Sequence, residues 1–519
     1  MPIQLLWTAN QVLHAVAVLE EAVNADSRRG DGHATPLTRI RLDDIAIDRL
    51  AQQGLTLDSA PPRGARVVLR NNANLSTGGT ATDVTDEVHP LVAQRAVAAA
   101  MTVGLDVCGV DVVYQSVAEP LESQSGGIIE VNAAPGLRMH LSPSFGKGRN
   151  VGQAIIDHMF PPGEDGRIPL IAVTGTNGKT TTVRLTSHLL QKGGWRVGFT
   201  DIHGVYINGR QIDSGDCSGP RSARRVLAHP DVDVAVLETA RGGILREGLA
   251  FDRCQVAVVT NIGTGDHLGL NYITTVEDLS VLKRVIVQNV AVGGTAVLNA
   301  ADPHCVAMAD FCPGQITYFG PAPHHPVIAT HRALGKRVVF VEDGHIVAAE
   351  GGWQVRLPLA QIPLTGGGIL AFQVDNVMAA IAAAWAVGVP WEAIARGQEG
   401  FVSDAATVPG RFNRFEYRGA TVIADYGHNP DAIAALCHAA EALPAGKRVA
   451  VISAAGDRRD QDIVDKPARS DRFLTKWCCS RRSGRRGAGA HRASCGAGLV
   501  ARGLTDSAIS PKTAGPHGP

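Results

Sequence analysis

The sequence predicts an α/β protein of several domains, with a central parallel sheet that helices cover on both faces. An apolar run at residues 168–173 passes through a glycine turn into residues 183–190, whose apolar spacing suits a helix. Similar Val-, Ile- and Ala-rich runs recur between helical patterns, at residues 232–237, 255–260 and 295–299. Near-continuous apolar strands that alternate with helices are typical of parallel sheets. At 519 residues the chain is also too long for one core.

Composition shifts along the chain divide it into three segments and a tail. We expect a first segment at residues 1–162, a central domain at 166–408, a third domain at 409–460 and a tail at 461–519. The first segment mixes helical and strand patterns and ends in the Pro- and Gly-containing breaker at residues 160–163. In the third domain, strand-like runs at residues 420–425 and 448–453 flank a helical pattern over 430–442. We find no internal repeat.

The tail differs from the rest of the chain in composition. From Arg472 to the last residue it has seven arginines and two lysines against one acid, Asp506, and apolar periodicity vanishes. One interpretation is a basic arm that binds a polyanion. We favour another, in which a strand–helix domain is cut off and out-of-frame translation of a GC-rich gene follows. The tail is then expected to be aberrant and disordered.

Bulk composition narrows the classes of protein that fit. Hydrophobic residues make up 45% and charged residues 19% of the chain, as in folded soluble enzymes. A formal net charge of zero gives no general attraction to nucleic acid or membrane, and no apolar run reaches membrane-spanning length. Nine cysteines lack metal-ligand spacing, and Cys478 and Cys479 are adjacent, so we expect incidental thiols. The cytoplasm is the expected location.

The motif Gly-Thr-Asn-Gly-Lys-Thr at residues 175–180 is the strongest functional signal. A strand that runs through a glycine turn into a helix start aims backbone N–H groups and the helix dipole at one point. Lys179 then places an ammonium beside phosphates, and the Thr180 hydroxyl can reach Mg²⁺. Because Val173 stands where the longer motif has glycine, this is the shorter G-x-x-G-K-T form. The alternative is an ordinary tight turn with a surface lysine. The other expected phosphate contacts are Thr176, Asn177, Gly178 and Thr181.

Two further side chains are expected at the same edge of the sheet. Glu238 follows one apolar run, and the run after it leads into Thr-Asn-Ile-Gly-Thr-Gly-Asp-His at residues 260–267. Ligands of open parallel sheets bind beyond the carboxyl ends of the strands. Alone, Glu238 fits a surface carboxylate and His267 a locally hydrogen-bonded ring. Together with Thr180 they predict a second Mg²⁺ site.

These motifs together resemble those of a known family. The phosphate motif, the strand-end glutamate, the run at 260–267 and Asp-Tyr-Gly-His-Asn-Pro at 425–430 resemble the Mur ligase family, which joins a carboxylate to an amine through an acyl phosphate. More narrowly, residues 215–220, 238–248 and 263–269 resemble the cyanophycin synthetase family.

The first segment extends this resemblance. Residues 74–83 and 130–140 resemble the ATP-grasp domain of cyanophycin synthetases, so that the resemblance covers residues 25–460. The implied fold is a partial ATP-grasp (α+β) domain, a Mur ligase-like P-loop domain with a parallel sheet, and an incomplete Rossmann-like C-terminal domain. We expect the chain to lack the earlier ATP-grasp lobe, whose lysines clamp the nucleotide, and to carry an incomplete closing domain.

The resemblance also implies roles for residues of the central and third domains. Lys179 would hold the ATP phosphates and Thr180 one Mg²⁺, while Glu238 and His267 would serve a second Mg²⁺. Lys283 falls where Mur ligases carry a lysine that is often carbamylated, although an ordinary exposed helix lysine also fits. Further implied contacts are Asn376 with adenine, and Arg411 and Asp425 with the nucleotide from the third domain.

The chemistry of amide formation agrees with this assignment. A carboxylate is a poor electrophile, and phosphoryl transfer to it creates a leaving group that a neutral amine can displace. Metal ions and a lysine must neutralise charge between the two anions and align them. A third domain that closes over the site would exclude water, which otherwise hydrolyses the acyl phosphate.

The first segment should hold a second ligase site. Asp111, Glu130 and Asn132 offer oxygen ligands from two adjacent strands, as ATP-grasp enzymes do for Mg²⁺. The alternative is strand-end acids that cap turns. Arg70 and the loop at residues 71–82 would face polymer or phosphate. Without the earlier lobe, this site would keep its metal ligands but lose much of its hold on the nucleotide.

The leading hypothesis is an ATP- and Mg²⁺-dependent ligase that adds L-arginine to aspartate β-carboxyls of the cyanophycin polymer or primer. In the intact enzyme the ATP-grasp half adds L-aspartate to the backbone. For this chain we expect no aspartate addition, and weak or absent arginine addition. The alternatives are another Mur or folylpolyglutamate-type ligase and a catalytically inactive remnant that binds ATP or polymer. We expect no nucleic-acid or membrane partner, and the resemblance implies a homo-oligomer.

Overall fold

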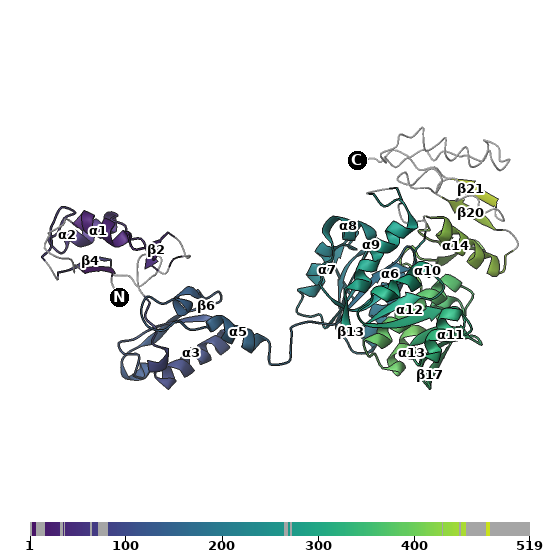
Figure 1. Ribbon diagram of the computed structural model, residues 1–519, viewed down its shortest axis with the longest axis horizontal. Coiled ribbons are helices and arrows are strands. Elements are labelled where there is room, and N and C mark those ends of the chain that lie inside the picture. Colours follow the sequence, from purple (N-terminus) through teal and green to yellow (C-terminus); the bar gives the residue numbers. More distant parts are fainter. Residues whose placement is uncertain are drawn as a thin grey trace. The chain divides into compact units, whose positions relative to one another are not determined.

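The computed structural model describes two compact units, Met1–Arg167 and Ile168–Pro519 (Figure 1). The residues described are 3–6, 16–31, 35, 37–62, 65–70, 81–263, 268–269, 272–427, 429–445, 448–452 and 474–477. The chain thus divides close to the predicted end of the first segment.

The first unit contains short helices and paired strands. Its elements are β1 Ile3–Leu6, α1 Val16–Asn24, β2 Arg29–Gly30, β3 Leu37–Thr38, α2 Asp44–Ala51, β4 Arg66–Arg70, η2 Thr85–Glu87, α3 Pro90–Val103, β5 Gly109–Val113, η3 Leu121–Ser123, β6 Gly127–Asn132, α4 Arg138–Leu141 and α5 Val151–Met159. The Asp43 side chain caps α2 by accepting from the Ala46 N–H. Helix α3 begins with Pro90 and ends at Gly104, which has a left-handed backbone (φ 81°).

Strands β5 and β6 form an antiparallel pair in the second half of this unit. Their register places Asp111 directly opposite Glu130. Side chains that are directly opposite on an antiparallel pair lie on the same face of the sheet. The two carboxylates predicted to bind Mg²⁺ therefore face the same side.

The second unit is built on an eleven-stranded sheet among the described residues, in the order β10-β9-β8-β11-β7-β12-β13-β14-β15-β16-β17 (Figure 1). The strands are β7 Leu170–Thr174, β8 Val197–Asp201, β9 Gly204–Ile207, β10 Arg210–Ser214, β11 Val234–Glu238, β12 Cys254–Val259, β13 Val290–Asn299, β14 Gln315–Gly320, β15 Val338–Glu342, β16 His345–Glu350 and β17 Trp353–Pro358. All neighbours are parallel in the part of the sheet with the order β8-β11-β7-β12-β13-β14-β15. Antiparallel strands complete both ends.

Helices cover both faces of this sheet. They are α6 Lys179–Lys192, α7 Pro220–Leu227, α8 Arg241–Glu247, α9 Val276–Gln288, α10 Pro303–Ala307, η4 Met308–Phe311, α11 Pro326–Ala333, η5 Leu359–Gln361, η6 Pro363–Thr365, α12 Ala371–Ala386 and α13 Trp391–Glu399. Alternate residues of β7 belong to different apolar cores: Ile171 and Val173 pack with α6 and α12, whereas Leu170 and Ala172 pack with α7 and α9. Burial on both faces is why this strand is continuously apolar.

The C-terminal part of the second unit carries smaller pairs of strands. Its elements are β18 Asn413–Tyr417, β19 Ala420–Ala424, α14 Pro430–Ala442, β20 Val449–Ile452 and β21 Leu474–Trp477. Strands β18 and β19 form an antiparallel hairpin, and β20 pairs in parallel with β21. Strand β21 lies inside the segment 461–519, for which the sequence predicted no regular structure.

The predicted α/β fold with a largely parallel central sheet is confirmed. The apolar runs predicted at residues 168–173, 232–237, 255–260 and 295–299 correspond to β7, β11, β12 and the second half of β13. Helix α14 spans the residues of the predicted helical pattern 430–442. The ATP-grasp assignment of the first unit stays a prediction.

None of the helices that the structure describes is both long enough and apolar enough to cross a membrane.

Candidate functional site

The phosphate motif forms the turn between β7 and α6. Two of its glycines, Gly175 and Gly178, have positive φ angles of 146° and 89°. A Cβ atom on Gly175 would lie 1.9 Å from Thr260 Oγ1, and one on Gly178 would lie 2.2 Å from Asn376 Oδ1. Both positions therefore require glycine for backbone conformation and for space.

Side chains and backbone from the end of β12 hold this turn in place. Thr260 Oγ1 donates to the Asn177 carbonyl at 2.6 Å, and Asn261 Oδ1 accepts from the Asn177 N–H at 2.9 Å. Thr176 Oγ1 accepts from the Gly263 N–H at 2.9 Å. The turn is thus organised by the protein itself, as a backbone phosphate site needs to be.

Two lysines converge on the turn. Lys179 Nζ donates to the carbonyls of Gly175 and Thr176, at 2.9 and 3.2 Å. Lys283 Nζ, from α9, donates to the same Gly175 carbonyl at 2.9 Å. Lys283 is fully buried, so the alternative of an ordinary exposed helix lysine is wrong. Two ammonium groups at one carbonyl place positive charge at the turn, which favours an anionic ligand.

Glu238 and Thr180 lie side by side at this edge of the sheet. Glu238 ends β11, opposite Val173 of β7, and its Oε2 accepts from Thr180 Oγ1 at 2.9 Å. Glu238 is only 2% exposed, and its Oε1 has no hydrogen-bond partner within the described structure. Burial raises the pKa of this carboxyl, against the opposing effect of the Lys179 charge. A buried carboxylate oxygen without a partner beside a hydroxyl is a donor set that suits Mg²⁺.

Other predicted metal ligands of this site give less information. His267 lies outside the described residues, as does Asp266. Within the described ranges, no group of three or more His, Cys, Asp or Glu side chains gathers as a metal cluster. Thr180 and Glu238 are thus the described residues that would hold Mg²⁺ at the phosphate turn.

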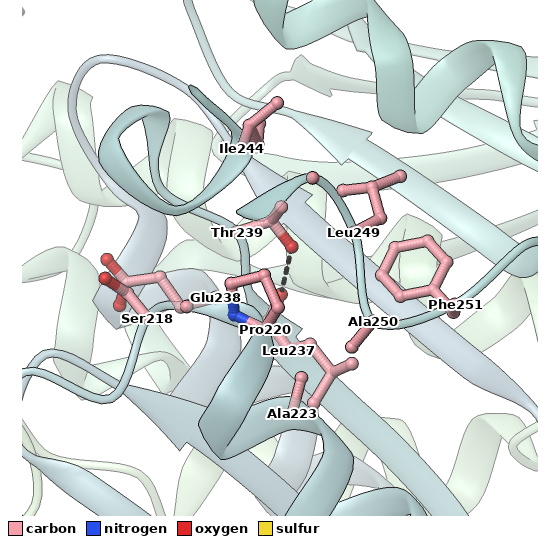
Figure 2. A pocket seen from close by; sticks show the side chains of 12 residues that line it. Ser218, Pro220, Ala223, Leu237, Glu238, Thr239, Ile244, Leu249, Ala250 and Phe251 are labelled. Carbon is pink, nitrogen blue, oxygen red and sulfur yellow. Dashed lines mark hydrogen bonds between the residues drawn. The ribbon is translucent and has the colours of Figure 1, made fainter. Parts of the chain in front are cut away.

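A pocket opens beside Glu238 (Figure 2). It is lined by the start of α7, the end of β11, Ile244 of α8 and residues 248–251. In Figure 2 the Glu238 carboxylate points to the same side as Ser218, away from the apolar side chains of Leu249 and Phe251. Ser218 Oγ donates to Asp216 at 2.6 Å. The pocket is small, with a volume of about 10 Å³, which is room for one water molecule.

Helix α12 contributes the predicted adenine contact. Asn376 is 6% exposed, and its Nδ2 donates to Gln373 Oε1 at 3.0 Å. Its Oδ1 lies against Gly178, so Asn376 lies at the base of the phosphate turn. Its neighbour Asp375 was not predicted as a site residue. Burial raises the pKa of Asp375 to about 7.

Residues of the C-terminal part reach the same site. Arg411 Nη2 donates to Thr180 Oγ1 at 3.4 Å, which brings the guanidinium to the predicted metal ligand. Asp425 accepts from the backbone N–H groups of Phe412 and Gly427, at 2.8 and 2.6 Å. Burial raises the pKa of Asp425, and the Arg411 charge opposes this. Asp425 thus holds the backbone next to Arg411.

Sequence reasoning missed Asn429. This residue is fully buried, and its Oδ1 caps α14 by accepting from the Ala432 N–H at 2.8 Å. Its Nδ2 donates to Asn177 Oδ1 in the phosphate turn at 2.9 Å. The sequence signal was available, because an asparagine followed by proline is a typical helix start. Its second contact, across 252 residues, carries no local signal.

The first unit brings its three predicted ligands together. Asn132 Nδ2 donates to Glu130 Oε1 at 3.1 Å, and Glu130 is opposite Asp111. Desolvation raises the pKa of Asp111, and the hydrogen bond and charge of Glu130 add to it. Paired carboxylates of this kind suit a divalent cation. The Arg70 side chain and residues 71–80 lie outside the described residues.

Comparison with known proteins finds two domain families in the second unit. The Mur ligase middle domain matches residues 173–384, which contain the phosphate turn, Glu238, Lys283 and Asn376. The family described as Mur ligase, glutamate ligase domain matches residues 410–491, which contain Arg411 and Asp425.

Two cyanophycin synthetases are similar to most of the chain. Cyanophycin synthetase of Synechocystis sp. is 44% identical over 451 residues, which are 87% of this chain and 51% of that protein. Cyanophycin synthetase of Crocosphaera subtropica is 44% identical over 452 residues, 87% of this chain and 52% of that protein. The chain therefore spans about half the length of the curated relatives it matches.

Among solved structures, a bifunctional folylpolyglutamate synthase/dihydrofolate synthase with Mn, AMPPNP and L-glutamate bound is similar to 67% of this chain. The similarity covers 82% of that chain, with 21% sequence identity and a TM-score of 0.49.

Proposed function

Because the chain belongs to the Mur ligase family, we propose that it is an ATP-dependent amide ligase of the cyanophycin synthetase type. Its central site would bind ATP and Mg²⁺ and join the amine of L-arginine to aspartate β-carboxyls of the cyanophycin polymer. The proposal rests on one observation, the arrangement of side chains around the phosphate turn. Two lysines meet at the phosphate turn, and the unpartnered oxygen of Glu238 lies next to Thr180.

Each residue of this arrangement has a distinct task. Lys179 is free to turn from the turn carbonyls to the ATP phosphates, because both contacts are with its own turn. Mg²⁺ held by Thr180 and Glu238 would neutralise phosphate charge while the carboxylate substrate approaches. Arg411 adds a third positive charge from the C-terminal part. The adenine role of Asn376 and the nucleotide role of Asp425 belong to the same proposal.

Lys283 has a special place in this proposal. Its amine is buried and lies at the phosphate turn, where carbamylation would exchange a cation for an anionic oxygen ligand. That exchange would give the metal site one more oxygen donor. This is the role that the resemblance to Mur ligases implies for Lys283. His267 would complete this second Mg²⁺ site.

For the first unit we propose that Asp111, Glu130 and Asn132 hold Mg²⁺ at the aspartate-adding site. The cytoplasmic location and a homo-oligomer complete the proposal.

Amino-acid incorporation tests this function. The protein is incubated with ATP, Mg²⁺, labelled arginine and an aspartate-terminated primer, and a parallel reaction carries labelled aspartate. We expect at most weak arginine incorporation, which requires ATP and is lost in Lys179→Ala, and no aspartate incorporation. ATP binding without any incorporation would instead support a remnant that only binds its ligands. Incorporation that survives in Lys179→Ala would contradict the proposed site.

A further inference from the structure

Arg184 forms a buried hydrogen-bonded centre one helical turn after Thr180. Its Nε donates to Asp201 Oδ2 at 2.5 Å and its Nη2 to Tyr206 Oη at 2.8 Å. Its Nη1 donates to the carbonyl of Thr407 at 2.7 Å. Arg184 is 8% exposed and Asp201 is fully buried. One guanidinium thus connects α6, the end of β8, β9 and the chain just before Arg411.

The surroundings of this guanidinium leave it little freedom. It lies 5.0 Å from the ring centre of Tyr206 and 5.9 Å from that of Phe199, and these two rings stack at 4.4 Å. The other oxygen of Asp201 accepts from the N–H groups of His203 and Gly204, at 2.8 and 3.1 Å. Only arginine presents several donors in one plane, so a lysine can keep the ion pair but not all three contacts.

The segment that receives the third contact is itself well ordered by hydrogen bonds. In residues 403–413, Asn413 accepts from the Gly410 N–H at 2.7 Å and donates to the Val408 carbonyl at 3.0 Å. Ser403 Oγ donates to the Arg411 carbonyl at 2.5 Å. A displacement of Thr407 would therefore also move Arg411, because these hydrogen bonds hold the residues between them in a compact turn.

The two contacts have the same spacing on α6 and on the segment 403–413. Thr180 and Arg184 are four residues apart on α6 and so lie on one face of the helix. Thr407 and Arg411 are also four residues apart, and they contact Arg184 and Thr180 respectively. The segment 403–413 thus follows the helix in the opposite direction, and its far contact is the predicted metal ligand.

We propose that Arg184 is a positioning residue, which fixes the segment 403–413 on α6 so that Arg411 stays at Thr180. This inference rests on the proposed function, because the value of that position lies in a nucleotide site at Thr180. The contact with Thr407 is the one that Arg184 itself makes with the segment that carries Arg411, one helical turn from the contact of Arg411 with Thr180.

Hydrogen–deuterium exchange on the full chain tests the proposal. The variants are Arg184→Lys, Arg184→Met and the control Arg196→Lys, which alters an exposed arginine–aspartate pair with Asp233 at 2.6 Å. We expect amides of residues 403–413 to exchange at least ~10-fold faster in both Arg184 variants, with no change in the control. Amides of β12 should exchange as in the wild type, which shows that the core is intact. If Arg184→Met fails to fold, Arg184→Lys carries the test.

A second measurement separates this inference from the proposed function. Each protein is examined again with Mg²⁺ and AMPPNP. Protection of residues 172–182 reports nucleotide binding, and we expect less protection in both Arg184 variants than in the wild type and the control. If the wild type gains no protection there, the proposed function fails, while the comparison of 403–413 without nucleotide still tests Arg184. Wild-type exchange of 403–413 in Arg184→Lys would overturn the positioning role, since that variant keeps the charge but loses the Thr407 contact.

Discussion

The two candidate metal sites use the same kinds of side chain in opposite surroundings. In the second unit, Glu238 ends a strand at the centre of a sheet covered on both faces, and it is 2% exposed. In the first unit, Asp111 and Glu130 face each other on a two-stranded pair and are exposed. Both sites therefore offer carboxylates, and these carboxylates differ in burial.

Burial changes how strongly a bound cation would stabilise each site. A charge removed from water interacts more strongly with its neighbours and costs more when it has none. Within the described residues Glu238 has one oxygen without a hydrogen-bond partner, so a cation bound there would stabilise the folded chain more. Asp111 and Glu130 are exposed and lose less of their hydration, so a cation would stabilise them less. The comparison teaches that burial in a sheet core would make a carboxylate depend more strongly on a bound cation.

The largest expected effect tests the phosphate turn. Lys179→Ala should weaken nucleotide binding by ~100-fold, because a charge-assisted contact with the phosphates is lost. Calorimetry with ATP and Mg²⁺ measures this, with Lys192→Ala at the other end of α6 as the control. Undiminished affinity in Lys179→Ala would move the nucleotide site elsewhere in the chain.

The next effect tests burial at Glu238. Glu238→Gln keeps the size of the side chain and an acceptor for Thr180 but removes the charge. We expect Mg²⁺-dependent nucleotide affinity to fall by ~10- to 100-fold. The melting temperature without Mg²⁺ should stay the same or rise, because a buried charge is gone. Glu247→Gln, at the exposed end of α8, is the control. A large drop in melting temperature would show that Glu238 acts in folding and not in metal binding.

A smaller effect concerns Asp375, a carboxyl that is not a predicted metal ligand, so it tests burial without metal binding. Burial raises the pKa of Asp375 from 3.8 to about 7. Between these values the folded protein holds a proton that the unfolded chain has released, so stability falls as pH rises and the loss is complete above pH 7. Asp375→Asn should therefore stabilise by about 2 kcal/mol at pH 8 and by little at pH 4. Urea unfolding at both values measures this, and equal effects at the two pH values would contradict it.

The smallest effect concerns the first unit. Asp111→Asn should leave nucleotide affinity at the phosphate turn unchanged within ~2-fold, because the two sites belong to different compact units and sites that share no partners act independently. The same calorimetric titration, alongside Glu238→Gln, makes the comparison direct. A drop as large as that of Glu238→Gln would mean that the two sites are coupled, and the contrast between them would no longer hold.

Local patterns predicted those parts of the site that neighbouring residues determine. The turn at 175–180, the strand end at Glu238 and the helix over 430–442 all follow from short-range signals. Lys283 could have been predicted as buried, since Leu279, Ile286 and Val287 share its helix face. The contacts of Arg184 with Thr407 and of Asn429 with Asn177 join residues more than 200 positions apart. No periodicity records such contacts, because packing alone decides them.

The contact between Asn177 and Asn429 also has a consequence for synthesis on the ribosome. The phosphate turn emerges 252 residues before the asparagine that completes it. At typical elongation rates of about 5–20 residues per second, the nascent chain carries an unfinished turn for roughly 10–50 s. During that interval the sheet can already form around β7, but ATP meets a turn that is still open on one side.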